Sequence, residues 1–121
     1  MPDSILSCAD LVRAQYGVDT DVRESPAGLV VGVTDQVLLR NSPNRIALTV
    51  VNFSANQLII RPLLPATLTA GIKIPAGGGV FTIDWRDDAI LPAFEWHAIS
   101  DIAGSAVYWI ETFLVGKSPT G

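Results

Sequence analysis

Cysteine and histidine are almost absent from this sequence, which has one of each among its 121 residues. The single cysteine, Cys8, cannot form a disulfide within the chain, so the fold must be held together by other interactions. The single histidine, His97, cannot supply the several converging ligands of a metal centre and is expected to be an ordinary strand residue. We therefore expect neither a metal site nor a cofactor.

Charge is also scarce. Charged residues make up 17% of the chain, against about 25% in an average soluble domain. The net charge is -4 and the basic residues are scattered, so nucleic acid is not an expected partner. The fold could still gather four arginines into a local basic patch: Arg40, Arg45, Arg61 and Arg86.

Long hydrophobic runs are missing as well, although the mean hydropathy is high at +0.38. No run approaches the roughly 18 apolar residues of a membrane-spanning helix, so no contact with a membrane is expected. The N-terminus also lacks the cationic start and apolar core of a secretory signal, which favours folding in a reducing cytoplasm. The excess of apolar residues predicts that part of the surface faces another chain.

The first 28 residues read as an arm. Apolar residues between positions 5 and 16 fall at helical spacing, and Gly17 stands where such a helix would end. Residues 18–28 are polar and include Pro26 and Gly28, a composition typical of a linker. The arm either reaches a neighbouring subunit or caps its own domain.

Residues 29–121 read as one all-β domain. Strand-length apolar runs recur at the spacing of about 8 to 12 residues that is typical of sandwiches and barrels. Eight strands are predicted: Leu29–Val33, Val37–Arg40, Arg45–Phe53, Gln57–Leu63, Gly71–Ile74, Val80–Trp85, Phe94–Ser100 and Ala106–Val115. The predicted fold is an antiparallel β-sandwich or jelly-roll-like domain with a short N-terminal helical arm, and a small barrel satisfies the same pattern.

Two of these strands form the centre of the predicted core. The short segment SAN separates Arg45–Phe53 from Gln57–Leu63 and predicts a tight hairpin. Its expected core residues are Ile46, Leu48, Val50, Leu58 and Ile60. The strands Arg45–Phe53 and Ala106–Val115 are apolar on both faces, so a second layer or another subunit must cover the second face.

Candidate catalytic groups are few. Four carboxylates, those of Asp84, Asp87, Asp88 and Glu95, lie near Trp85 and Trp96. Such a group could serve a glycosidase or bind calcium. A solvated turn between two strands, with the tryptophans in the core, explains the segment better because calcium-loop spacing is absent. The segment PAGGGV lacks the lysine and hydroxyl residue that end a phosphate loop, and no Gly-x-Ser-x-Gly motif is present.

Several β segments resemble small accessory proteins of tailed-bacteriophage virions, which are head decoration or other minor structural proteins. The resemblance follows one order: NRIALTVVN (Asn44–Asn52), GIKIPAGGG (Gly71–Gly79), the aromatic-acid turn Trp85–Asp88, EWHAIS (Glu95–Ser100) and GSAVYWIE (Gly104–Glu111). It covers roughly the C-terminal two-thirds of the chain. The resemblance implies a β-sandwich-like module that performs no chemistry and binds a protein lattice, as a homotrimer at a local symmetry axis.

The leading interpretation is therefore a capsid-decorating or cementing protein, made in the host cytoplasm and located in the virion. Its expected partners are copies of itself and the lattice of the major capsid protein, which it would stabilise by mass action. The candidate partner-binding residues are Ile5, Val12, Tyr16, Ile46 and Val107.

Two other classes remain open. The alternative is a carbohydrate- or receptor-binding module of a phage tail or fibre, with Trp85, Trp96 or Trp109 as a stacking platform. An enzyme is the least expected class, because the sequence lacks a recognisable set of nucleophile, base and metal ligands.

Overall fold

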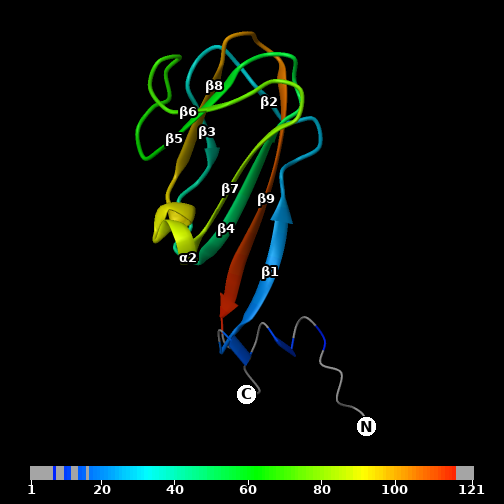
Figure 1. Ribbon diagram of the computed structural model, residues 1–121, viewed down its shortest axis with the longest axis vertical. Coiled ribbons are helices and arrows are strands. Elements are labelled where there is room, and N and C mark those ends of the chain that lie inside the picture. Colours follow the sequence, from blue (N-terminus) through cyan, green and yellow to red (C-terminus); the bar gives the residue numbers. More distant parts are fainter. Residues whose placement is uncertain (1–6, 8–9, 12–13, 16, 117–121) are drawn as a thin grey trace.

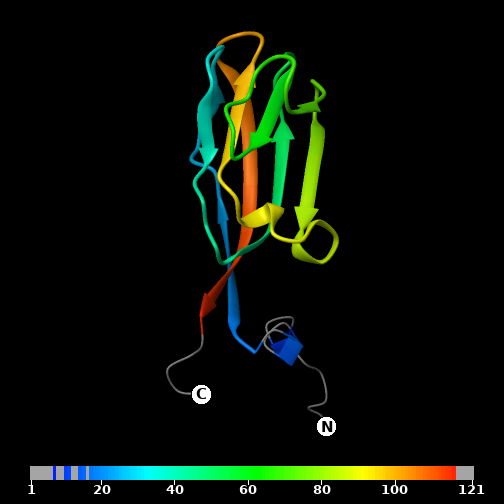
Figure 2. The same cartoon turned by 90° about the vertical axis from the view of Figure 1, so that its left-hand side faces the viewer.

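The chain folds into two antiparallel β-sheets that enclose one core (Figures 1 and 2). The computed structural model describes residues 7, 10, 11, 14, 15 and 17–116. The predicted antiparallel all-β class is confirmed, and the packing of two sheets is compatible with a sandwich. No helix in this part of the chain has the length and hydropathy needed to cross a bilayer.

The larger sheet has the strand order β1-β9-β4-β7, and β2 also pairs with β9. Its strands are β1 (Asp19–Glu24), β2 (Val30–Val31), β4 (Arg45–Asn52), β7 (Gly79–Asp84) and β9 (Ser105–Gly116). The smaller sheet has the order β3-β8-β5-β6. Its strands are β3 (Gln36–Leu39), β5 (Leu58–Pro62), β6 (Ile72–Ile74) and β8 (Trp96–Ser100). The short helices α2 (Trp85–Asp88) and η1 (Leu91–Ala93) connect β7 to β8.

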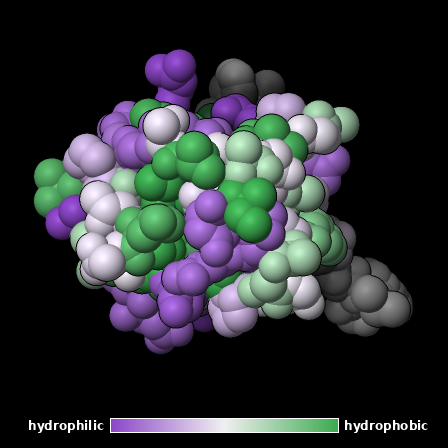
Figure 3. All heavy atoms as spheres, turned by 90° about the horizontal axis from the view of Figure 1, so that it is seen from above, coloured by the Kyte–Doolittle hydropathy of each residue, from purple (hydrophilic) through white to green (hydrophobic). Residues whose placement is uncertain are grey.

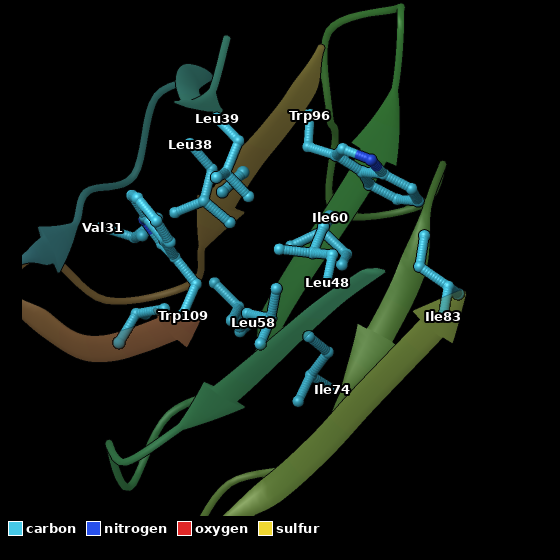
Figure 4. Close-up of a cluster of buried hydrophobic side chains, with 13 residues drawn as sticks. Val31, Leu38, Leu39, Leu48, Leu58, Ile60, Ile74, Ile83, Trp96 and Trp109 are labelled. Atoms are coloured by element: carbon cyan, nitrogen blue, oxygen red, sulfur yellow. The ribbon is translucent and has the colours of Figure 1, made fainter. Parts of the chain in front are cut away.

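The core lies between the sheets, where alternate side chains of each strand meet (Figure 4). Leu48 and Val50 of β4 and Leu58 and Ile60 of β5 are buried as predicted. Each fully buried side chain of this kind contributes roughly 1.5 to 3 kcal/mol. Ile46 differs because the register shifts between Arg45 and Ala47, which leaves Ile46 only half-buried.

The predicted hairpin is wrong. Strand β4 pairs with β7 and β9 in the larger sheet, whereas β5 pairs with β6 and β8 in the smaller one. Residues 53–57 therefore carry the chain from one sheet to the other. The physical reason is that β7 and β9 already occupy both edges of β4. Asn52, which is completely buried, bonds to the crossing backbone at Ser54 and Asn56 and to Ile74 of β6.

The predicted linker is also wrong over residues 19–24. These residues form β1, which pairs with β9 from Asp19 opposite Gly116 to Glu24 opposite Ile110. The two strands run side by side beyond the rest of their sheet (Figure 1). A polar composition is compatible with an edge strand, because charged side chains at an edge face water and discourage pairing with other chains. The β-domain thus starts about ten residues before the predicted boundary.

The predicted N-terminal helix falls largely outside the described residues. Asp10, Leu11, Ala14 and Gln15 are helical. The candidate contact residues Ile5, Val12 and Tyr16 lie outside the described part of the chain.

Candidate functional site

The outer face of the larger sheet is uncharged at its centre. Cross-strand pairing places Thr49 beside Thr82 and Ile110, and Val51 beside Val80 and Tyr108. These side chains are half-buried or exposed, and the Thr49 and Thr82 hydroxyls are 3.0 Å apart. The strands predicted to be apolar on both faces therefore bury one face against the smaller sheet and present the other outward.

A polar contact lies at the rim of this outer face. The Tyr108 hydroxyl donates to Glu24 Oε2 at 2.7 Å, which fastens β1 to β9. The hydrogen bond to the Glu24 carboxylate raises the pKa of Tyr108 above its ordinary value, because the carboxylate favours the protonated hydroxyl. The charged group in this contact, the Glu24 carboxylate, thus lies at the margin of the outer face.

The second apolar surface is the connection between β5 and β6, residues 63–71, which we name the leucine loop. Leu63, Leu64 and Leu68 are each at least half exposed. This segment contains no charged residue, and its flanking residues Pro62 and Ile72 are uncharged as well. Neighbouring exposed leucines on one uncharged loop are typical of a surface that contacts another molecule.

The backbone of the leucine loop is fixed. Leu63 has a positive φ of 70°, a strained conformation for a bulky residue, which persists only where surrounding contacts enforce it. Its N–H donates to Glu95 O at 2.8 Å. Farther along, Ala66 is buried on the outer side of the smaller sheet against Ile59 and Ile99. The loop therefore holds its leucines outward from a constrained backbone.

His97 links the two positions at which the backbone of the leucine loop is held, Leu63 and Ala66. Its Nδ1 lies 2.9 Å from Asp35 Oδ2, and its Nε2 lies 3.0 Å from Glu95 Oε1. Asp35 Oδ1 in turn accepts the N–H of Ala66 at 2.7 Å. Both ring nitrogens can donate to a carboxylate only when the imidazole is protonated. The network thus links Leu63, through Glu95, His97 and Asp35, to Ala66.

This histidine is not placed to hold a metal. The two carboxylates contact opposite nitrogens of the ring, so they cannot converge on one ion together with it. No group of three or more potential metal ligands occurs among residues 17–116 and the few described before them. His97 is a strand residue of β8, as expected, with a structural role that the sequence did not predict.

Replacing His97 by leucine is expected to lower the free energy of unfolding by about 1.5 to 3 kcal/mol, the range for hydrogen bonds to charged groups. The local effect is the more informative one. Protection of the Ala66 amide from hydrogen exchange should be lower in the variant than in the wild-type protein, because Asp35, which accepts this N–H, loses its contact with the imidazole ring. Equal protection of this amide in the two proteins would contradict the anchoring role.

The carboxylates near α2 are occupied by local structure. Asp84 caps the helix, since its Oδ1 accepts from Arg86 N at 2.8 Å and from Asp87 N at 3.1 Å. Asp88 Oδ2 accepts from Asp84 N at 3.0 Å. These residues connect two strands as predicted, but they form the short helix α2 and not a turn.

The tryptophans divide into two kinds. Trp96 lies in the core as predicted, and Trp109 is buried there as well, whereas the prediction is wrong for Trp85, which is 44% exposed. The physical reason is that Trp85 begins α2 instead of ending β7, so the strand alternation that would bury it has already stopped. Arg86 lies over the Trp85 ring, with its guanidinium carbon 5.8 Å from the ring centre.

The four arginines considered for a basic patch do not converge. Arg61 donates to Pro65 O in the leucine loop, and Arg86 lies against Trp85. Arg40 and Arg45 do lie together, and Arg23 of β1 joins them around a pocket of about 410 Å³. The sequence could not indicate Arg23, because it fell within the predicted linker.

The two remaining candidate partner-binding residues, Val107 and Ile46, lie in different environments. Val107 is 5% exposed and belongs to the core, so it is not available to a partner. Its side chain points between the sheets, while Ala106 and Tyr108 beside it face outward. Ile46 borders a shallow pocket with Trp85. The leucine loop was missed, although its uncharged sequence LLPATL was a usable signal.

The end of the domain that is formed by the loops near Gly32, Phe53 and Ser100 has a surface of mixed polarity. Backbone hydrogen bonds between Ser100 and Gly32, and between Phe53 and Ala106, bring its connections together. Seen from above, hydrophobic groups there alternate with hydrophilic ones (Figure 3). The leucine loop, uncharged throughout, is therefore the stronger candidate for a binding surface.

Comparison of the chain with known protein families, curated proteins and solved structures gives no match.

Proposed function

We propose that this protein is a structural component of a tailed-bacteriophage virion, a capsid decoration or cementing module that performs no chemistry. The fold is proposed to be a jelly roll. This is supported by the strand orders β1-β9-β4-β7 and β3-β8-β5-β6, in which most connections cross between the sheets. Jelly rolls are common in viral capsid and lectin domains.

The observation that carries the proposal is the leucine loop. Three exposed leucines cost solubility, yet their backbone is held in place. The Glu95 carbonyl holds Leu63 in a strained conformation, and the His97 network holds Ala66. A pre-ordered apolar loop loses little conformational entropy on binding, which favours docking onto a rigid protein surface. Bound across neighbouring capsomers, the module stabilises the assembled shell relative to its dissociated subunits.

Binding to capsid shells that lack the protein tests this proposal by co-sedimentation. The variants Leu64→Asp and Leu68→Asp are expected to bind at least tenfold more weakly, because each buries a carboxylate in an apolar contact. The matched control is Ile90→Asp, which places the same charge at an exposed apolar residue outside the loop. Equal binding of all variants, or no binding of the wild-type protein to shells, would refute the proposal.

Self-association is proposed to use the outer face of the larger sheet and to give a homotrimer. Light scattering over a tenfold range of concentration measures the mass of the wild-type protein and of Val80→Lys, which places a charge at an exposed position of this face on the edge strand β7. The variant should be monomeric. A truncation that tests the N-terminal arm must begin no later than Asp19, because a later start would cut into β1.

One observation favours the alternative, a carbohydrate-binding module of a tail or fibre. Trp85 is exposed beside a shallow pocket of about 210 Å³. Iodide should quench only a minor part of the tryptophan emission, and Trp85→Phe should remove that part because Trp96 and Trp109 are buried. If a glycan shields Trp85 from iodide while shell binding is absent, the alternative is favoured.

A further inference from the structure

The pocket near Arg40 lies at one side of the domain, between the edge strands β1 and β3. Its volume of about 410 Å³ falls within the range typical of small-molecule sites, roughly 300 to 1,000 Å³. The apolar part of its lining comes from both sheets and from the turn after β1: Pro26, Leu29, Leu38, Leu39 and Trp109. The pocket is separate from the leucine loop and from the outer face of the larger sheet.

The charged part of the lining is positive. Three arginines and one glutamate, Arg23, Arg40, Arg45 and Glu111, give a formal sum of +2. This contrasts with the net charge of -4 for the whole chain. A local surplus of guanidinium groups in an acidic protein is a feature that recognises anions.

The arginines are not equivalent. Arg45 is buried, and its guanidinium donates to Glu111 Oε2 and to three backbone carbonyls. Arg23 is mostly exposed and lies 3.7 Å from Glu111 Oε1, with its guanidinium over the Phe113 ring. Arg40 is exposed and forms no ion pair within the described part of the chain. Arg45 therefore belongs to the scaffold, and Arg23 and Arg40 are the groups that can meet a ligand.

We infer that this pocket binds a small amphipathic anion, with a carboxylate or phosphate head and a short apolar body. The head contacts Arg40 and Arg23 at the rim, where guanidinium groups can donate paired hydrogen bonds to such oxygens. The apolar body lies against Leu29, Leu38 and Trp109. Glu111 is kept from repelling the head because Arg45 neutralises it at 2.8 Å.

Calorimetric titration of the full chain with four probes of equal chain length tests this site: octanoate, octyl phosphate, octanol and octylamine, all below micelle-forming concentrations. Octanoate or octyl phosphate should bind saturably with one site per chain, and the tighter of the two identifies the preferred head. Octanol and octylamine should bind at least tenfold more weakly. Affinity for the anion should also fall as salt is added, since the rim is exposed.

Arg40→Gln and Arg23→Gln are each expected to weaken binding of the anion at least fivefold. Arg61→Gln and Arg86→Gln are the matched controls, because both remove an arginine outside the pocket and should leave affinity unchanged. Circular dichroism verifies that each variant is folded. The inference is overturned if neither anion binds saturably, if octanol binds as tightly as the preferred anion, or if Arg40→Gln binds that anion like the wild-type protein. Shell binding is measured separately, so either proposal can fail alone.

Discussion

Replacing Arg45 by methionine is expected to lower the free energy of unfolding by about 3 to 5 kcal/mol. The variant removes a guanidinium that is only 4% exposed and leaves the Glu111 carboxylate, equally buried, without its close partner. It also removes the donor to three carbonyl groups, those of Arg40, Pro92 and Phe94. Urea unfolding monitored by circular dichroism measures the loss.

A double variant separates the contribution of the ion pair to stability from that of the other Arg45 contacts. Arg45→Met with Glu111→Leu removes both charges, and a buried pair replaced by apolar residues is often neutral in stability. About half of the loss should therefore be recovered, while the unpaired carbonyls account for the remainder. Arg61→Met is the control, because its guanidinium donates a single surface hydrogen bond at 3.2 Å and should change stability by less than about 0.5 kcal/mol. A loss at Arg45 no larger than this control would contradict the argument.

This buried pair also shows what the sequence could not reveal. Arg45 and Glu111 are 66 residues apart, and nothing in their local sequences distinguishes them from solvated charges at strand positions. Their burial follows from the pairing of β4 with β9, where Glu111 stands opposite Leu48 and points inward. Long-range pairing of this kind is set by the tertiary fold and not by local propensity.

The strands themselves were well predicted. Each of the eight predicted strands is present, with ends displaced by two residues at most. Their signal was strong because β-branched and aromatic residues alternate in β7 and fill both faces of β4 and β9. The missed strand, β1, lacks this signal because none of its residues is buried. Its six residues are half-buried or exposed, so a polar sequence such as DTDVRE is tolerated there.

The candidate surfaces were only partly predictable. Apolar patterning correctly indicated that β4 and β9 have two apolar faces, but it could not say which of their residues face outward, and Val107 was assigned to the wrong face. A one-residue change of register moves every side chain to the opposite face. The leucine loop was overlooked because a search for alternating strands passes over the connections between them, where binding residues are often found.

Replacing Asn52 by alanine is expected to lower the free energy of unfolding by about 3 to 4 kcal/mol, since each buried polar group left unpaired costs about 1 to 3 kcal/mol. Asn52 Nδ2 donates to Asn56 O at 2.8 Å and to Ile74 O at 3.1 Å. Its Oδ1 accepts from Ser54 N at 3.0 Å and from Ser54 Oγ at 2.7 Å. All four bonds lie where the chain leaves β4 for the other sheet.

The same bonds explain why SAN is not a hairpin turn. A hairpin would return β5 to the edge of β4, but β7 and β9 already occupy both edges. Asn52 supplies the hydrogen bonds that the crossing backbone cannot make with a neighbouring strand. Asn44→Ala, at an exposed asparagine just before the same strand, is the control and should change stability by less than about 0.5 kcal/mol. A loss below about 1 kcal/mol for Asn52→Ala would mean that strand pairing alone directs the crossing, because the cost of unpaired groups would then be absent.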